Sequence, residues 1–154
     1  MRFYSIGLDI KNKKVVIVGG GKIAEKKVKN LLPYESYISL VSPDLTDDLQ
    51  KLAERKKIGY FKKKYSTADI KNAFLIFACT SDNKINKKIF RDAKKLGILV
   101  NVCDKTKLCN FIVPAVIKKN GLLITVSSDG KNPKLSKRFK EVLENEIADL
   151  WNKL

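Results

Sequence analysis

Residues 15–24 read VVIVGGGKIA, and this stretch decides the fold class. Four consecutive β-branched apolar residues are typical of a parallel strand that is buried on both faces. The glycines after them permit a tight turn, and the residues from Ile23 to Leu32 have the apolar spacing of a helix that Pro33 ends. A strand, a glycine turn and a helix in this order predict an α/β fold with a doubly wound, Rossmann-like parallel sheet.

The glycine turn matches the dinucleotide fingerprint in its alanine-ended form, Gly19-x-Gly21-x-x-Ala24. Gly19 permits the turn, Gly21 lets backbone N–H groups approach a pyrophosphate, and Ala24 lets the helix pack close to the strand. We therefore expect Gly19, Gly21, Lys22 and Ile23 to bind a dinucleotide. A P-loop is excluded because Ile23 stands where that motif needs serine or threonine. The alternative is a glycine turn in an α/β protein that binds nothing.

The second strand is predicted over residues 37–41, and the fingerprint expects an acidic residue at its end to hold the ribose 2′-hydroxyl. This chain has Ser42, Pro43 and Asp44 there, and we expect all three at the cofactor site, with Ser42 and Asp44 as the candidate ribose ligands. No arginine or lysine lies between residues 30 and 50 to hold a 2′-phosphate. The sequence therefore favours NAD over NADP.

The next segments continue the alternation of strands and helices: a helix over 46–55, strands over 58–61 and 73–78, a helix over 83–96 and a strand over 98–102. In an open α/β sheet, ligands lie beyond the carboxyl ends of the strands, where the strand order reverses. Thr80 and Ser81 follow the fourth strand and are candidates to line a cofactor cleft. The alternative is that their hydroxyls cap the next helix.

The pattern changes after the fifth strand. Two apolar runs, 111–117 and 122–127, flank an Asn-Gly pair and predict a hairpin. Asn132 and Pro133 cap and open a last helix, whose apolar residues recur at helical spacing: Leu135, Phe139, Val142, Leu143, Ile147, Leu150 and Trp151. We expect an NAD-binding domain over 1–110, in which residues 2–10 pack on the sheet, and a dimerisation and substrate-side region over 111–154. The last helix either packs on the hairpin or meets a second subunit.

Composition limits the functional classes. The 154 residues include 32 basic and 16 acidic residues, for a net charge of +16, and a surface of this charge attracts polyanions. The lysines are spread along the chain instead of clustered, so neither a nucleic-acid nor a membrane partner is expected. No apolar run approaches the roughly 18 residues of a membrane span and residues 1–7 lack a signal-peptide pattern, so we expect a cytoplasmic protein.

Cysteine usage agrees with that location and argues against a metal site. The cysteines, Cys79, Cys103 and Cys109, are odd in number and form no C-x-x-C pair, and the chain has no histidine. We therefore expect no bound metal. Cys103 and Cys109 are interpreted as small apolar core residues.

Together, five segments resemble the precorrin-2 dehydrogenase family, the NAD-binding part of sirohaem synthases. They are residues 18–27, 73–86, 101–104, 109–115 and 127–135. The resemblance implies oxidation of precorrin-2, a tetrapyrrole with many carboxylates, to sirohydrochlorin with NAD⁺. Some members also insert Fe²⁺. The chain ends at Leu154, where relatives often continue, so we expect no methyltransferase domain and hold iron insertion as the less supported activity.

Asp104 is the candidate proton acceptor. It follows the fifth strand directly and aligns with the functional aspartate of the family that the chain resembles; the alternative is a turn cap. Asn101 and Ser128 either bind substrate carboxylates or close loops. Lys22, Lys105 and Lys107 are expected near the mouth of the cleft, where they would attract a polycarboxylate.

Two other functional classes remain open at this point. An NAD(H)-sensing regulatory module would explain the glycine turn and a dimer, but not the segments 101–104 and 127–133. A nucleic-acid binder would rest on charge alone and predicts salt-sensitive retention on DNA.

Overall fold

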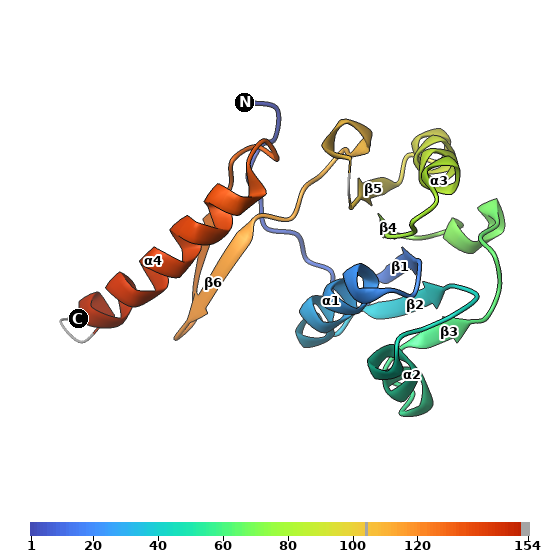
Figure 1. The fold of residues 1–154 in the computed structure, drawn as a ribbon, viewed down its shortest axis with the longest axis horizontal. Coiled ribbons are helices and arrows are strands. Elements are labelled where there is room, and N and C mark those ends of the chain that lie inside the picture. Colours follow the sequence, from blue (N-terminus) through green and yellow to red (C-terminus); the bar gives the residue numbers. More distant parts are fainter. Residues whose placement is uncertain (104, 152–154) are drawn as a thin grey trace. The chain divides into compact units, whose positions relative to one another are not determined.

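The computed structural model describes residues 1–103 and 105–151, and the chain divides into two compact units. The larger unit is Ile6–Phe111, and the smaller one combines Met1–Ser5 with residues from Ile112 onward. Figure 1 traces the larger unit from blue through yellow and the smaller one in orange and red, apart from its blue N-terminal segment.

A five-stranded parallel sheet forms the centre of the larger unit, in the order β3-β2-β1-β4-β5. The strands are β1 (Lys14–Val18), β2 (Tyr37–Val41), β3 (Gly59–Phe61), β4 (Leu75–Ala78) and β5 (Leu99–Val102). The helices are α1 (Lys22–Leu31), α2 (Asp47–Glu54) and α3 (Asn83–Lys95), with short 3₁₀ turns at Leu32–Tyr34, Thr67–Ile70 and Thr106–Leu108. This is the predicted Rossmann-like class, and the strand order reverses between β1 and β4.

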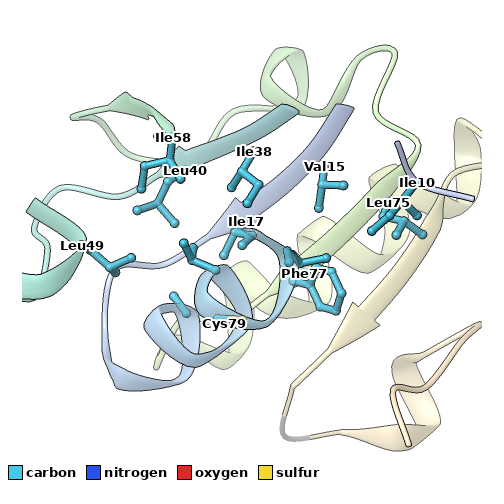
Figure 2. Close-up of a cluster of buried hydrophobic side chains, with 13 residues drawn as sticks. Ile10, Val15, Ile17, Ile38, Leu40, Leu49, Ile58, Leu75, Phe77 and Cys79 are labelled. Carbon is cyan, nitrogen blue, oxygen red and sulfur yellow. The ribbon is translucent and has the colours of Figure 1, made fainter. Parts of the chain in front are cut away.

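Burial on both faces explains the continuous apolar sequence of the central strands. Val15, Val16 and Ile17 are successive residues with opposite orientations, yet each is 0% exposed. Figure 2 shows the cluster on one face, where the labelled side chains of β1, β2 and β4 lie side by side; Ala24, Val28 and Leu31 of α1 belong to the same cluster. Helix α3 packs on β4 and β5.

The N-terminal segment divides between the two units, which corrects the prediction that residues 2–10 pack on the sheet. Only Ile10 belongs to the sheet's core. The backbone N–H groups of Arg2 and Phe3 instead donate to the carboxylate of Asp129, at 2.9 to 3.0 Å. These two donors hold the pKa of Asp129 below its usual range. The periodicity of Phe3, Ile6 and Leu8 gave no sign of this partner because it lies more than a hundred residues away.

The smaller unit contains an antiparallel hairpin of β6 (Ala115–Lys119) and β7 (Leu122–Val126). Asn120 and Gly121 form its turn with φ values of 47° and 82°, as a type I′ turn requires. The first hairpin strand was predicted to begin four residues and to end two residues too early. Lys118 and Lys119 belong to the strand, because a two-residue turn leaves only the Asn-Gly pair outside the ladder.

Helix α4 (Pro133–Trp151) follows, and its start is capped as predicted: Asn132 Oδ1 accepts the Leu135 N–H at 3.0 Å. The helix contacts β6 and β7, yet Leu135, Phe139 and Val142 remain about half exposed. Packing on the hairpin therefore leaves apolar side chains of α4 in solvent. None of the helices in the described ranges is long and apolar enough to cross a membrane.

Candidate functional site

The glycine loop joins β1 to α1 at the carboxyl edge of the sheet. Gly19 has φ = +114°, a conformation that side chains rarely permit, and its N–H donates to Val41 O of β2 at 2.9 Å. A Cβ atom on Gly19 would lie 2.5 Å from the carbonyl oxygen of Cys79, at the end of β4. The glycine loop therefore packs directly on the carboxyl ends of β2 and β4, the two strands beside β1.

Gly20 is the residue of this loop that the fingerprint leaves unspecified, and it is the most tightly enclosed. A Cβ atom there would lie 1.9 Å from Asp44 O and 2.9 Å from the Ser42 hydroxyl oxygen. The Gly20 carbonyl also accepts the Thr46 N–H at 3.0 Å. The absence of a side chain at Gly20 thus lets the glycine loop contact the segment between β2 and α2. The unbroken run of glycines is the only sign of this contact in the sequence.

Gly21 faces open space instead: no atom lies within 4 Å of the position that its Cβ would take. It is the N-cap of α1 in extended conformation, and no side chain caps the helix there. The first intrahelical bond runs from Glu25 N–H to Gly21 O, so the preceding N–H groups are not bonded within the helix. An uncapped, accessible helix N-terminus fits the pyrophosphate of a dinucleotide.

Glu25, in the first turn of α1, is buried and lies at the centre of a polar cluster. Its carboxylate accepts hydrogen bonds from the ammonium groups of Lys29 (2.9 Å) and Lys22 (3.1 Å) and from the Thr46 hydroxyl (2.8 Å). These bonds, with that of Lys29 strongest, lower the pKa of Glu25 from 4.5 to about 2. Lys22, predicted to bind the cofactor, is therefore paired with Glu25 while most of its side chain remains exposed.

This cluster predicts a pH dependence of stability. The pKa of Glu25 is lowered by folding, so its stabilising contribution is present above about pH 4.5 and is lost as the pH falls toward 2. Glu25→Gln is expected to reduce the acid-induced loss of unfolding free energy in that window, measured by urea unfolding at several pH values. Glu54→Gln is the control, because Glu54 is exposed and its carboxylate accepts a bond only from Gln50 among the described contacts. If both variants lose the same amount of unfolding free energy between about pH 4.5 and 2, Glu25 is not the source of this pH dependence.

The candidate ribose segment lies at the carboxyl end of β2, beside the end of β3. Ser42 is buried and its N–H donates to Phe61 O at 3.3 Å, whereas Pro43 and Asp44 are exposed. The Tyr60 hydroxyl donates to Pro43 O at 3.3 Å. Burial, followed by the charge of Asp44, raises the pKa of Tyr60. The Asp44 carboxylate is thus accessible at the edge where the fingerprint places a ribose.

Sequence reasoning missed that residues 62–64, all lysine, follow β3 at this same edge. The segment between residues 30 and 50 has no arginine or lysine to hold a 2′-phosphate, but parallel pairing places the end of β3 beside the end of β2. Lys63 pairs with Asp69, and Lys62 and Lys64 are exposed. Positive charge therefore lies closer to the candidate ribose site than the sequence order indicated.

The turn after β4 rules out the alternative that the hydroxyl groups of Thr80 and Ser81 cap the next helix. Asp82 caps α3, because its carboxylate accepts the N–H groups of Lys84 and Ile85 at 2.7 and 3.2 Å; neither Thr80 nor Ser81 does so. The Thr80 hydroxyl donates to the side chain of the buried Asn86 at 2.8 Å.

The same turn is closed from the other side by Asn86, whose amide donates to Thr80 O at 2.9 Å. Thr80 therefore fixes the β4–α3 turn at the edge of the site, and Ser81 is exposed there.

The carboxyl end of β5 holds the predicted substrate-side residues of the larger unit. The buried Asn101 amide donates to Phe111 O at 3.1 Å, so this side chain closes the loop after β5. Lys105 is partly exposed and its carbonyl accepts the Leu108 N–H at 2.8 Å. Asp104 lies outside the described residues.

Ser128 belongs to the smaller unit, where its hydroxyl oxygen accepts the Asn132 N–H at 2.9 Å in the loop before α4. Among residues 1–103 and 105–151, no group of three or more histidine, cysteine or acidic side chains is arranged to hold a metal ion.

Comparison with known proteins gives matches along the whole chain. The model of a family described as putative NAD(P)-binding matches residues 6–115. A probable multifunctional siroheme biosynthesis protein HemA of Ruminiclostridium josui is 39% identical over 139 residues, and a siroheme synthase of Nitrosococcus oceani is 31% identical over 154. These alignments cover 90% and 100% of this chain but 27% and 33% of the relatives, so the chain spans about a third of the curated relatives it matches.

A solved structure, that of SirC, a precorrin-2 dehydrogenase, superimposes with a TM-score of 0.83 at 31% identity. The superposition covers 94% of this chain and 71% of SirC. The similarity therefore includes the hairpin and much of the last helix as well as the dinucleotide-binding unit.

Proposed function

Because this chain belongs to the precorrin-2 dehydrogenase family of NAD(P)-binding proteins, we propose that it oxidises precorrin-2 to sirohydrochlorin with NAD⁺. The observation that carries the proposal is the accessible, uncapped N-terminus of α1, framed by Gly19 and Gly21. Such a site binds a pyrophosphate, and the similarity to SirC covers nearly all of this chain.

The glycine loop and the first turn of α1 would hold the cofactor, with the N–H groups of Lys22 and Ile23 directed at the pyrophosphate. Bound NAD⁺ would supply the hydride acceptor. Ile23, about half exposed, would cover the cofactor's apolar surface, and Ser42 and Asp44 would lie by the ribose. Thr80 would keep the turn after β4 in place, and the exposed Ser81 would contribute a hydroxyl to the cleft.

We propose NAD over NADP because the exposed Asp44 carboxylate would repel a 2′-phosphate. The lysines of residues 62–64 would instead attract a 2′-phosphate, so the decisive measurement is the affinity for NADH relative to that for NADPH. Titration with NADH and NADPH is expected to give tighter binding of NADH; tighter binding of NADPH would reverse the assignment.

The positive charge suits a substrate with many carboxylates. Lys105 is partly exposed and Lys107 exposed after β5, and the chain carries a net charge of +16. In the proposal these lysines mainly raise the association rate of the substrate, which falls as ionic strength rises, and Ser128 is a candidate ligand of a substrate carboxylate.

Oxidation of precorrin-2 removes a hydride and a proton, so the protein must supply one proton acceptor. We propose Asp104, which follows β5 directly in the sequence. With no histidine in the chain, a carboxylate is the natural base at this edge.

Asp104→Asn is expected to lower turnover of precorrin-2 by about 10²- to 10⁴-fold, the usual contribution of a general base, while NADH affinity remains that of wild type. The measurement is the rate of NADH formation, with NADH affinity from fluorescence titration. Glu54→Gln, at the C-terminal end of α2, is the control and should keep full activity. Wild-type turnover by the Asp104 variant would remove this residue from the mechanism.

The same assay separates the enzyme from an NAD(H)-sensing module. Wild-type protein that binds NADH but does not consume precorrin-2 would favour the sensor. Addition of Fe²⁺ after oxidation tests iron insertion, which would change the absorption spectrum from that of the free macrocycle. The metal ion in that reaction would be a substrate.

We also propose that the chain forms a homodimer through α4. Leu135, Phe139 and Val142 remain about half exposed on this helix, and burial of such side chains would favour association. Analytical ultracentrifugation that gives the mass of one chain would refute the dimer.

The proposed location is the cytoplasm, where cell fractionation should recover the protein.

A further inference from the structure

Two cysteines lie side by side at the carboxyl edge of the sheet. Ala78 of β4 pairs with Val102 of β5, and each is followed by a cysteine, Cys79 and Cys103. The Cys103 N–H donates to Ala78 O at 3.0 Å, so the ladder continues to this position.

The two thiol groups point toward each other. Their sulfur atoms are 2.8 Å apart, in a contact in which either can donate. Neighbouring strands lie about 4.8 Å apart, within the range of Cα separations that a disulfide can bridge. Backbone pairing therefore already provides the spacing that a cross-link needs.

Cys109 is placed differently. It is 2% exposed, and its sulfur atom accepts the Val102 N–H at 3.2 Å. Cys79 is 8% exposed and Cys103 is partly exposed, so Cys103 is the thiol of this pair that an oxidant can reach first.

We propose that Cys79 and Cys103 form a reversible disulfide when the protein meets a peroxide, and that this oxidation weakens cofactor binding. The Cys103 thiolate attacks one peroxide oxygen and becomes a sulfenic acid, while the other oxygen leaves as water. The Cys79 sulfur then attacks the Cys103 sulfur, and the sulfenic oxygen leaves as a second water. Two thiols and one H₂O₂ thus give one disulfide and two waters, and a dithiol reverses the reaction by exchange.

Contact between Cys79 and the glycine loop links this chemistry to the cofactor site. A Cβ atom on Gly19 would lie 2.5 Å from Cys79 O, 2.7 Å from Cys79 C and 3.0 Å from Thr80 N. The loop therefore rests on the backbone of Cys79 with no intervening space. A covalent link at the Cys79 side chain constrains that backbone, and the constraint reaches Gly19 directly. This second part rests on the proposed cofactor site, whereas disulfide formation does not.

The test treats the whole reduced protein with H₂O₂ under anaerobic conditions and maps its peptides without reduction. Wild type is expected to lose 2 Da, the two hydrogens of the thiols, with the Cys79 and Cys103 peptides joined. The Cys109→Ser variant should also lose 2 Da and give the joined peptides. The Cys79→Ser and Cys103→Ser variants should not form this cross-link. Wild type that retains all its thiols, or that joins Cys109 to either partner, would overturn the proposal, and this result requires no variant to fold.

The effect of the disulfide on cofactor binding is measured separately, as the affinity for NADH. NADH affinity of the oxidised wild type is expected to fall about tenfold and to return after treatment with dithiothreitol, while Cys79→Ser shows no oxidant effect. Unchanged NADH affinity in fully cross-linked protein would overturn the coupling. If the reduced protein binds no NADH, the proposed function fails, while the peptide map still decides whether the disulfide forms.

Discussion

A Gly21→Asp protein is expected to fold as stably as wild type and to lose NADH affinity by about 100-fold or more. Gly21 is the N-cap of α1 in extended conformation, with open space around its Cβ position. Aspartate is a preferred N-cap residue, and its carboxylate would accept an N–H of the first turn. The same carboxylate would occupy the anion site. Two like charges about 5 Å apart repel by about 3 kcal/mol at an effective dielectric constant of 20, which is about 100-fold in affinity.

Two matched variants separate charge from size at this position. Gly21→Asn has the same shape and capping ability without the charge, and Gly21→Ala adds only a methyl group. Both should retain more NADH affinity than Gly21→Asp, with thermal midpoints close to that of wild type. Fluorescence titration and thermal unfolding are the measurements. If Gly21→Asp binds NADH within threefold of wild type, the glycine loop is not the pyrophosphate site.

The neighbouring glycine is expected to give the opposite result. Gly20→Ala should lower the free energy of unfolding by about 3 kcal/mol. Its Cβ would lie 1.9 Å from Asp44 O, so the segment after β2 must move. Overpacking of this kind costs about 1–3 kcal/mol. The movement would also break the bond from Thr46 N–H to Gly20 O, worth about 1 kcal/mol.

Urea unfolding of Gly20→Ala and Gly21→Ala measures this difference between adjacent residues. Gly21→Ala is the control because it places the same methyl group in open space, where the change is limited to the weaker N-cap preference of alanine, about 1 kcal/mol or less. Equal unfolding free energies for the two variants would show that the contact between the glycine loop and the segment after β2 does not limit stability.

Local sequence patterns predicted most of the secondary structure of the larger unit. The second strand begins and ends where predicted, and α1, α2 and α3 differ by about one residue at their ends. Errors arose where a local pattern had a distant partner. Residues 2 and 3 were predicted to pack on the sheet, but their N–H groups donate to Asp129, and the hairpin turn is shorter than its flanking lysines suggested.

The candidate site was predicted less completely, for a related reason. The fingerprint identified Gly19 and Gly21 because the turn and the helix N-terminus are local features. It did not identify Gly20, whose constraint comes from Asp44, or the lysines of residues 62–64, which lie beside the end of β2 only because β2 pairs with β3. Asp82 took the capping role considered for Thr80 and Ser81, since its carboxylate reaches the first N–H groups of α3.

The sequence by itself determined the fold class and the place of the glycine loop, because β-branched runs, glycine turns and helical periodicity act over a few residues. Only the tertiary structure decided which residues meet at the carboxyl edge of the sheet. Parallel pairing brought Cys79 to Cys103 and the end of β3 to the end of β2, and no local pattern records such pairings. Strand order therefore assembles the site from segments that are separated along the chain.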